Sequence, residues 1–242
     1  MKALARVRLK LLGDPELSID GAPVETLPKK AYVIAARLIL TGQERSATRD
    51  EMASFLWPEA PDEQRRASLR TVVKRIRIAL AEVAGRPFRI DAETIALDPE
   101  AAACDLIEFA ERIARGSLPD IVEASRLFSG ALLENGDAGP EGYRDWLMSE
   151  RKRLGQNFAR AATRALKGGA LLGQPRLRET IELKILAARP IHPPTHAAML
   201  KLQAQRGAAK LLRRPAPLVI AGWPLAPVDR RTPNANGEPE PA

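Results

Sequence analysis

The side chains with the clearest chemical potential are a run of basic residues between Arg65 and Arg77. This segment holds six Lys or Arg residues and no Asp or Glu. Arg presents a planar fork of donors that fits phosphate oxygens or guanine edges, whereas Lys acts as a point charge. The run is suited to binding a polyanion, and its clustering is more informative than the net charge of +8 for the whole chain.

The same search finds no constellation for catalysis or for a metal. His192 and His196 are four residues apart, but two prolines lie between them, and so a regular helical ligand pair is not expected. Cys104, the only cysteine, is expected to be a small buried apolar residue. The chain has no phosphate-binding loop and no nucleophile-elbow motif. The sequence therefore predicts that the protein is not an enzyme and uses no metal or cofactor.

Periodicity places the basic run on one face of an amphipathic helix that is expected from Pro61 to about Ala84. Its outward basic residues span only about 80° around the helix axis; they are Arg66, Arg70, Lys74 and Arg77. The apolar residues fall on the opposite face; they are Leu69, Val72, Val73, Ile76, Ala79 and Leu80. Two interpretations stay open: the basic face enters a DNA groove, or it is only the solvated face of a helix.

The surrounding elements indicate how this helix is positioned. Alternating apolar and polar residues predict strands at 7–11 and 16–19, and a third short strand at Val24–Leu27. A first helix is expected from Pro28 to Thr41, and a capping box of Thr48 and Glu51 begins a second. After the basic helix, a small hairpin is expected around Asp91–Thr94. Strands, three helices and a hairpin, in this order, predict a winged helix-turn-helix preceded by an antiparallel sheet.

The second half of the chain has the pattern of an all-helical domain. Apolar stripes predict a helix ended by Gly116, another ended by Gly130, and a long helix from Tyr143 to Leu172. A helical pair is expected at Leu177–Ala188 and Thr195–Gln205, and the spacing fits loosely a helix-loop-helix period of about 34 residues. Stacked hairpins of this kind leave grooves that bind peptides or proteins.

Two groups in this half each have two interpretations. Tyr143, Trp146 and Leu147 form either an exposed interaction patch or, as aromatic residues at helical spacing favour, a core contact of the long helix with Phe128. Residues 151–189 hold ten basic and two acidic residues. They form either a solvated helical face or a surface for an acidic protein partner or for DNA phosphates beside the site.

Short motifs in the N-terminal region, in this order and spacing, resemble the DNA-binding half of the Streptomyces antibiotic regulatory protein (SARP) family. They are Leu27-Pro28-Lys29-Lys30-Ala31, Thr48-Arg49-Asp50-Glu51, Phe55-Leu56-Trp57-Pro58, Arg66-Ala67-Ser68-Leu69-Arg70 and Lys74-Arg75-Ile76-Arg77-Ile78-Ala79-Leu80. This chain departs from the family at Lys74, where the family commonly has Ser or Thr.

Further motifs resemble the bacterial transcriptional activation domain of the same family. They include Cys104-Asp105-Leu106 with Phe109, Leu127-Phe128-Ser129-Gly130, Leu132-Leu133-Glu134 and the positions Tyr143, Trp146-Leu147, Glu150-Arg151 and Arg153-Leu154. The resemblance covers about residues 6 to 207. The family continues with more helical hairpins where this chain has residues 213–242, which are rich in Pro, Gly and Asn and are expected to be a disordered or truncated tail.

The resemblance implies a fold that is mainly α with small β elements. A winged helix of the response-regulator type is expected at residues 1–100, followed by a tetratricopeptide-like helical array at 104–212. It implies a sequence-specific transcription regulator, an activator, whose basic helix enters the major groove. The candidate DNA-contacting residues are Arg66, Arg70, Thr71, Lys74, Arg77, Arg86 and Arg89. The expected partners are double-stranded DNA, RNA polymerase and a second protomer on repeated half-sites; the alternative is a protein-interaction scaffold with a vestigial winged helix.

The composition limits the number of domains and the cellular compartment of the protein. A chain of 242 residues with 45% hydrophobic and only 4% aromatic residues favours one or two helical domains over a β-sandwich. A single cysteine excludes an intramolecular disulfide and fits a reducing cytosol. No apolar run approaches the ~18 residues of a membrane span, and the N-terminus lacks the apolar core of a secretory signal. We therefore expect a cytoplasmic protein with no membrane partner, and the resemblance to the SARP family implies that it is bacterial and nucleoid-associated.

Overall fold

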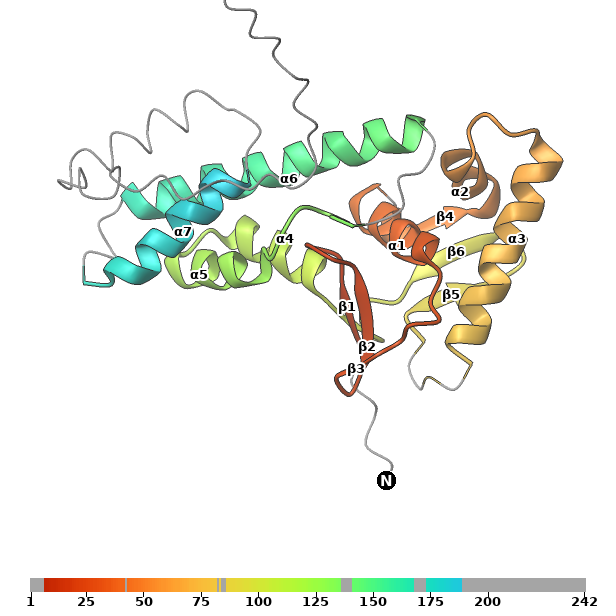
Figure 1. Cartoon of the computed structure of the whole chain (residues 1–242), viewed down its shortest axis with the longest axis horizontal. Coiled ribbons are helices and arrows are strands. Elements are labelled where there is room, and N and C mark those ends of the chain that lie inside the picture. The colour runs from red at the N-terminus through yellow and green to blue at the C-terminus, as the bar shows by residue number, and fades with distance from the viewer. Residues whose placement is uncertain are drawn as a thin grey trace, which may run out of the picture. The chain divides into compact units, whose positions relative to one another are not determined.

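The computed structural model describes residues 7–41, 43–81, 83, 86–135, 141–167 and 173–188, all of which belong to one compact unit within residues 1–202. These residues form helices and short strands that make a four-stranded and a three-stranded sheet (Figure 1). The expectation of a mainly α fold with small β elements is confirmed.

The four-stranded sheet combines the N-terminal strands with a strand from much later in the chain. β1 (Val7–Lys10) pairs antiparallel with β2 (Glu16–Ile19), and β2 pairs with β3 (Ala22–Pro23). On its other side β1 pairs in parallel with β7 (Ala103–Cys104). The first half of the chain is therefore joined by backbone hydrogen bonds to the segment that leads into the second half.

The turn between β2 and β3 corrects the predicted third strand. Asp20 and Gly21 have φ angles of 50° and 88°, which is the left-handed conformation that a two-residue hairpin turn requires. Ile19 therefore pairs directly with Ala22, and the strand occupies residues 22–23. The segment Val24–Leu27, which was expected to be the strand, forms the connection to the first helix instead.

α1 (Lys29–Thr41) is the central helix of the N-terminal region, and its bounds agree with the prediction. Residues 31–36 are all buried, because the helix is covered on nearly every side. It is followed by the 3-10 turn η1 (Gln43–Arg45), by β4 (Ser46–Thr48) and by α2 (Arg49–Leu56).

The predicted capping box at the start of α2 is confirmed. The Glu51 amide donates a hydrogen bond to Thr48 Oγ1 at 3.2 Å, and the Thr48 amide donates one to Glu51 Oε2 at 2.8 Å. A cap of this kind contributes about 1 kcal/mol. It fixes the first turn of α2 directly beside the helix that carries the basic run.

α3 (Asp62–Ala79) carries the basic run and ends earlier than the predicted Ala84. Leu80 leaves the helical conformation at φ −107° and ψ 14°, and its side chain is buried with 2% exposure. The backbone then continues in tight turns, since Val83 N–H donates to Leu80 O at 3.2 Å. The helix therefore ends at Ala79, five residues before the predicted Ala84.

The predicted hairpin follows α3 and is confirmed, with one addition. β5 (Phe88–Ile90) pairs antiparallel with β6 (Thr94–Leu97), and β4 pairs with the other edge of β6. The result is a three-stranded sheet in the order β4-β6-β5. β4 was not expected as a strand, because three residues between two helices carry no visible alternation.

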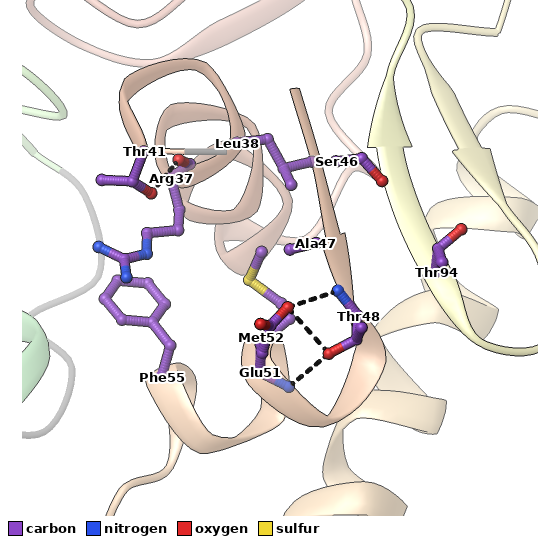
Figure 2. A pocket seen from close by; sticks show the side chains of 10 residues that line it. All are labelled: Arg37, Leu38, Thr41, Ser46, Ala47, Thr48, Glu51, Met52, Phe55 and Thr94. Carbon is purple, nitrogen blue, oxygen red and sulfur yellow. Dashed lines mark hydrogen bonds between the residues drawn. The ribbon is translucent and has the colours of Figure 1, made fainter. Parts of the chain in front are cut away.

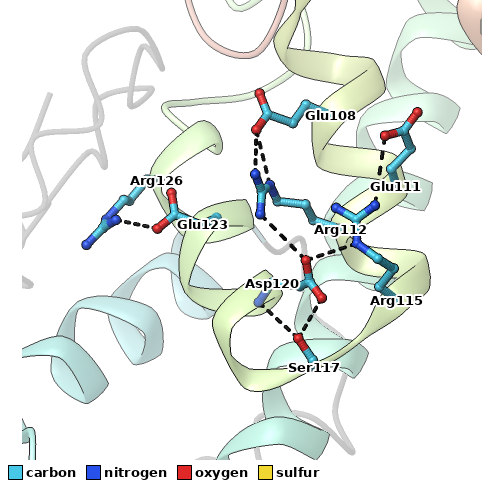
Figure 3. A network of polar contacts seen from close by, with 8 residues as sticks. All are labelled: Glu108, Glu111, Arg112, Arg115, Ser117, Asp120, Glu123 and Arg126. Atoms are coloured by element: carbon cyan, nitrogen blue, oxygen red, sulfur yellow. Dashed lines mark hydrogen bonds and ion pairs between the residues drawn. The ribbon is translucent and has the colours of Figure 1, made fainter.

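The second half of the chain begins with two helices joined by a tight turn. α4 (Asp105–Arg115) ends at Gly116, which has φ 66°, and Ser117 caps the start of α5 (Leu118–Leu127). Figure 3 shows Asp120 at the centre of this turn, where it pairs with Arg115 at 3.0 Å and with Arg112 at 3.5 Å. α5 ends at Leu127, earlier than the predicted Gly130, because Phe128 adopts a non-helical ψ of 80°.

Two longer helices pack on this pair. α6 (Glu141–Lys167) begins slightly before the predicted Tyr143, and α7 (Pro175–Ala187) matches the next predicted helix. Phe158 of α6 stacks on Phe128, with ring centroids 5.2 Å apart. Gly155 is required for the contact between α6 and the end of α7, since a Cβ there would lie 2.0 Å from the Ala188 carbonyl oxygen. The predicted helix end at Leu172, the helix at Thr195–Gln205, the pair His192 and His196, and the tail at 213–242 lie outside the described residues.

Tyr143, Trp146 and Leu147 pack inward, but against a different partner from the one predicted. Tyr143 and Leu147 are buried, with 2% and 5% exposure, which excludes an exposed patch. The rings of Tyr143 and Trp146 lie edge-on to Phe55 of α2, at centroid distances of 6.0 and 5.0 Å. The predicted partner, Phe128, packs further along α6. The sequence could not show this, because α2 and α6 are distant in the chain.

No helix in the described part of the chain is long and apolar enough to cross a membrane. Within the same residues, no three His, Cys, Asp or Glu side chains gather where they could hold a metal ion. Cys104 is buried as expected, and burial raises the pKa of its thiol to about 12.

Candidate nucleic-acid interface

The packing of α3 separates its basic and apolar residues as the periodicity predicted. Leu69, Val72, Val73 and Ile76 are buried against the rest of the N-terminal region. The four outward basic residues are exposed; they are Arg66, Arg70, Lys74 and Arg77. The basic side chains are therefore available to a partner, while the apolar ones hold the helix in place.

A hollow of about 470 Å³, which we call the α3 hollow, lies along this exposed face. Four of the residues that line it are cationic; they are Arg49, Arg70, Lys74 and Arg77. Its apolar lining comes from Val73, Ile78 and Ala81. Basic side chains from α2 and from α3 thus converge on one concave surface.

The four cationic side chains of the α3 hollow differ in their hydrogen-bond partners. Arg77 Nη2 donates a hydrogen bond to the Ile90 carbonyl of β5 at 2.9 Å, and Arg49 Nη1 lies 3.4 Å from the carbonyl oxygens of Asp91 and Ala92. These two side chains brace the hairpin against the helices. Neither Arg70 nor Lys74 makes an ion pair or side-chain hydrogen bond with any residue that the structure describes. They are the two cations most available to an anionic ligand.

Arg66 was predicted to contact DNA, but its guanidinium already has a protein partner. Its guanidinium forms a two-point ion pair with Asp50 of α2, with Nε–Oδ1 at 2.8 Å and Nη2–Oδ2 at 3.0 Å. This hydrogen bonding to Asp50 raises the pKa of Arg66 further. The pair carries no net charge, which moves the centre of positive charge along α3 toward Arg70.

The three remaining candidates lie at the margins of the site. Thr71 is exposed on α3, and its hydroxyl donates to the Ala67 carbonyl at 3.1 Å. Arg86, just before β5, donates to the Ala81 carbonyl at 2.9 Å and so ties the hairpin to the end of α3. Arg89 of β5 lies 3.5 Å from Asp98. All three are exposed, but none of them lines the α3 hollow.

Sequence reasoning did not name as site residues four of those that line the α3 hollow, which are Arg49, Val73, Ile78 and Ala81. Of these, Arg49 adds a cation and Ile78 an exposed apolar side chain. Arg49 directly follows the N-cap Thr48, and this position at the start of α2 was the available signal. Ile78 directly precedes Ala79, which was assigned to the buried face, yet its own side chain is 65% exposed. An exposed Ile in a basic stretch is visible in a helical projection, but only packing shows that it stays uncovered.

A second hollow, of about 500 Å³, lies between α1, α2 and the three-stranded sheet (Figure 2). Most of its polar groups already have protein partners: Thr48 with Glu51 in the capping box, and Thr41 with the Arg37 carbonyl. The Arg37 guanidinium lies 4.6 Å from the Phe55 ring centroid and 5.6 Å from that of Trp146. The lining of this hollow comes from α1, β4, α2 and β6, and it offers little free hydrogen-bonding capacity.

The basic residues in 151–189 divide into structural and exposed groups. Arg151 donates to the carbonyls of Leu132 and Leu133 at 2.7 and 2.6 Å, and Lys184 donates to those of Ser125 and Phe128. Arg178 forms a buried ion pair with Glu182 at 3.0 Å. Six basic side chains of the described part of this region are exposed. Arg153, which pairs with Glu150, follows one face of α6 together with Arg160, Arg164 and Lys167; the other two are Lys152 and Arg176. Part of the positive charge of this region therefore serves folding.

Comparison with known proteins supports the fold. No family model matches the chain, and no curated protein matches it. Among solved structures, Mycobacterium tuberculosis EmbR in complex with a low-affinity phosphopeptide is similar over 86% of this chain and 71% of its own, with a TM-score of 0.50 and 17% sequence identity. At this identity the likeness concerns the fold alone, and it agrees with the SARP-like fold that the sequence motifs imply.

Proposed function

We propose that this chain is a sequence-specific DNA-binding transcription regulator in which α3 enters the major groove. The observation that carries the proposal is the α3 hollow, where Arg70 and Lys74 have no partner among the described residues and two further cations line the same surface. A helix with a buried apolar face and an exposed basic face is the usual reader of the major groove. The likeness to EmbR, which concerns the fold alone, agrees with the fold that the SARP-like motifs imply.

The residues around the hollow are suited to different parts of a DNA site. Arg70 can make a bidentate contact to a guanine edge or to a phosphate, whereas Lys74 supplies a point charge to base or backbone acceptors. Arg49, Arg77 and Thr71 would contact the phosphates that flank the groove. Arg86 and Arg89 on the hairpin would meet the adjacent minor groove or its phosphates.

The helical region from α4 to α7 would then act as the activation domain. We infer, from the SARP-like motifs, a winged helix followed by a tetratricopeptide-like array that contacts RNA polymerase or a second protomer on repeated half-sites. This assignment places the protein in the cytoplasm, on the nucleoid. The sign of regulation rests on the motifs and not on the geometry of the hollow.

The alternative is a protein-interaction scaffold with a vestigial winged helix, and the exposed basic face of α6 favours it. Arg153, Arg160, Arg164 and Lys167 span only about 60° around α6. Arg153 already pairs with Glu150, and the other three would suit an acidic or phosphorylated peptide. EmbR was solved with a phosphopeptide, which is in keeping with this type of partner. The α3 hollow discriminates between the two functions, because a vestigial domain has no reason to keep that surface free of acidic side chains.

The test is a genome-wide pull-down of DNA bound to the full chain, followed by titration of a recovered duplex at several salt concentrations. We expect enriched sites, and a logarithm of affinity that falls with the logarithm of salt by about 0.9 for each phosphate contacted. The Arg70→Ala/Lys74→Ala double variant is the matched control and should lose the enrichment. Absence of enriched sites with the parent protein would favour the scaffold.

A further inference from the structure

Ile78 is an exposed apolar side chain among the cations of the α3 hollow. With 65% of its surface exposed, it lies on the last turn of α3, and it lines the hollow together with Lys74 and Arg70. Positions 70, 74 and 78 are spaced by four residues and therefore form one stripe along the helix. The Ile78 side chain contributes little apolar burial to the fold, because the described residues leave most of it exposed to solvent.

The surroundings of Ile78 restrict what can cover it. An apolar protein surface placed over Ile78 would also bury Lys74 and Arg70 without counter-charges, which is costly. The partner must therefore offer an apolar group within an array of negative charge and hydrogen-bond acceptors. The major groove of DNA has this combination: acceptor edges and phosphates surround the C5-methyl group of thymine.

We propose that Ile78 packs against a thymine methyl group and thereby makes a thymine part of the recognised site. The inference rests on the proposed function and extends it from a general DNA reader to one with a stated base preference. Adjacent turns of α3 are about 5.4 Å apart and base pairs about 3.4 Å. The thymine is therefore expected within about two base pairs of the contact made by Lys74.

The test uses the full chain and a duplex that this protein selects from a randomised library. Each thymine of that duplex is replaced in turn by uracil, which removes only the methyl group, and affinity is measured for the parent and for Ile78→Ala. At one position in each half-site, we expect uracil to weaken the parent by about fourfold, the factor for one buried methyl group. The same replacement should have no effect on Ile78→Ala. Met148→Ala removes an equally exposed side chain from α6, with 60% exposure, and should keep the full uracil effect.

The outcomes separate this inference from the proposed function. If the parent selects a duplex but no uracil replacement weakens it, or if Ile78→Ala is equally sensitive, the thymine contact is wrong while DNA binding stands. If Ile78→Ala instead lowers self-association in sedimentation and leaves the uracil effect intact, Ile78 belongs to an interface with a second copy and the inference is overturned. If no duplex is selected, the proposed function fails and the inference fails with it.

Discussion

Arg66 and Asp50 form a two-point ion pair between α3 and α2, with an Nε–Oδ1 distance of 2.8 Å and an Nη2–Oδ2 distance of 3.0 Å. Both side chains are exposed, by 54% and 65%, so that solvent screens the pair and its contribution to stability is small. Its main consequence is electrostatic. It neutralises one end of a face that the sequence presents as wholly cationic, and leaves Arg70 and Lys74 as the available charges.

The first prediction follows from this division of the basic face. Arg70→Ala and Lys74→Ala are each expected to weaken specific DNA binding by about 1–3 kcal/mol, as the loss of a base contact does, without changing thermal stability. Arg66→Ala should weaken it less, because Asp50 already competes for that guanidinium. Gel-shift titration of a selected duplex measures the effect, and Arg8→Ala on the exposed side of β1 is the matched control. Parent-like binding by both variants would refute docking through α3.

Asp50→Asn tests the ion pair from its other side. The substitution keeps the size of the side chain but releases Arg66, and we expect tighter binding to non-specific DNA. One additional phosphate contact would steepen the dependence of log affinity on log salt by about 0.9. The cost in stability should be small, because the exposed ion pair and the favourable charge in the first turn of α2 each contribute little. An unchanged salt slope would show that Arg66 stays away from the DNA.

Local patterns in the sequence predict the helices and the basic face, but not which residues meet across the chain. The faces of α3 follow from a period of 3.6 residues, and the capping box of Thr48 and Glu51 from a spacing of three, since both are local. The Arg66–Asp50 pair depends on how two helices pack, and no spacing encodes that. The same holds for the parallel pairing of β7 with β1, which joins residues about a hundred positions apart.

The aromatic residues of α6 illustrate the same limit. Helical spacing and size correctly predict that Tyr143 and Leu147 are buried, because large apolar side chains at that period favour a core. Their partner was predicted wrongly as Phe128, which is the nearest aromatic residue earlier in the chain. Phe55 of α2 occupies that place instead. Burial is thus encoded locally, whereas the partner depends on tertiary packing.

The third prediction concerns the buried face of α3. Leu69→Asp and Ile76→Asp would each place an unpaired carboxylate at a position with 1% exposure, which costs several kcal/mol. We expect loss of the cooperative thermal transition of the N-terminal region, measured by circular dichroism. Thr71→Asp adds the same charge on the exposed side and is the control: it should fold like the parent but bind DNA poorly. A parent-like transition in either buried variant would contradict the assignment of the faces.

The fourth prediction concerns the contact between α2 and α6. Phe55→Ala removes edge-on contacts to Tyr143 and Trp146 and the cation–π contact from Arg37, at 4.6 Å. The loss should lower the free energy of unfolding by about 2 kcal/mol, less than for a fully buried Phe because Phe55 is half-buried. Chemical denaturation measures it, and Phe55→Leu, which keeps most of the apolar volume, should lose less. If Phe55→Ala and Phe55→Leu lost the same free energy of unfolding, the aromatic ring contacts would contribute nothing to stability.

The last prediction concerns Asp105, the first residue of α4. Its carboxylate accepts hydrogen bonds from the backbone N–H groups of Leu11 and Leu12 at 2.8 and 2.9 Å and so ties α4 to the end of β1. Burial outweighs these bonds and raises the pKa of the carboxyl from 3.8 to about 6. A raised folded-state pKa means that the native protein binds this proton more tightly than the unfolded chain does. Asp105 therefore contributes to the stability of the folded protein below pH 4, where its carboxyl is protonated. This contribution is lost as the pH rises through 6 and the buried carboxyl ionises.

Asp105→Asn isolates this titration, because the amide cannot ionise and every other carboxyl is unchanged. The free energy of unfolding of the parent minus that of Asp105→Asn should fall as the pH rises from 4 to 7, by on the order of 3 kcal/mol for a shift of this size. Denaturant titrations at half-unit pH steps measure the difference, and Asp14→Asn, an exposed carboxyl near β1, is the matched control. A difference that stays constant across this range would show that Asp105 is ionised throughout and that its two N–H donors, rather than burial, dominate its environment.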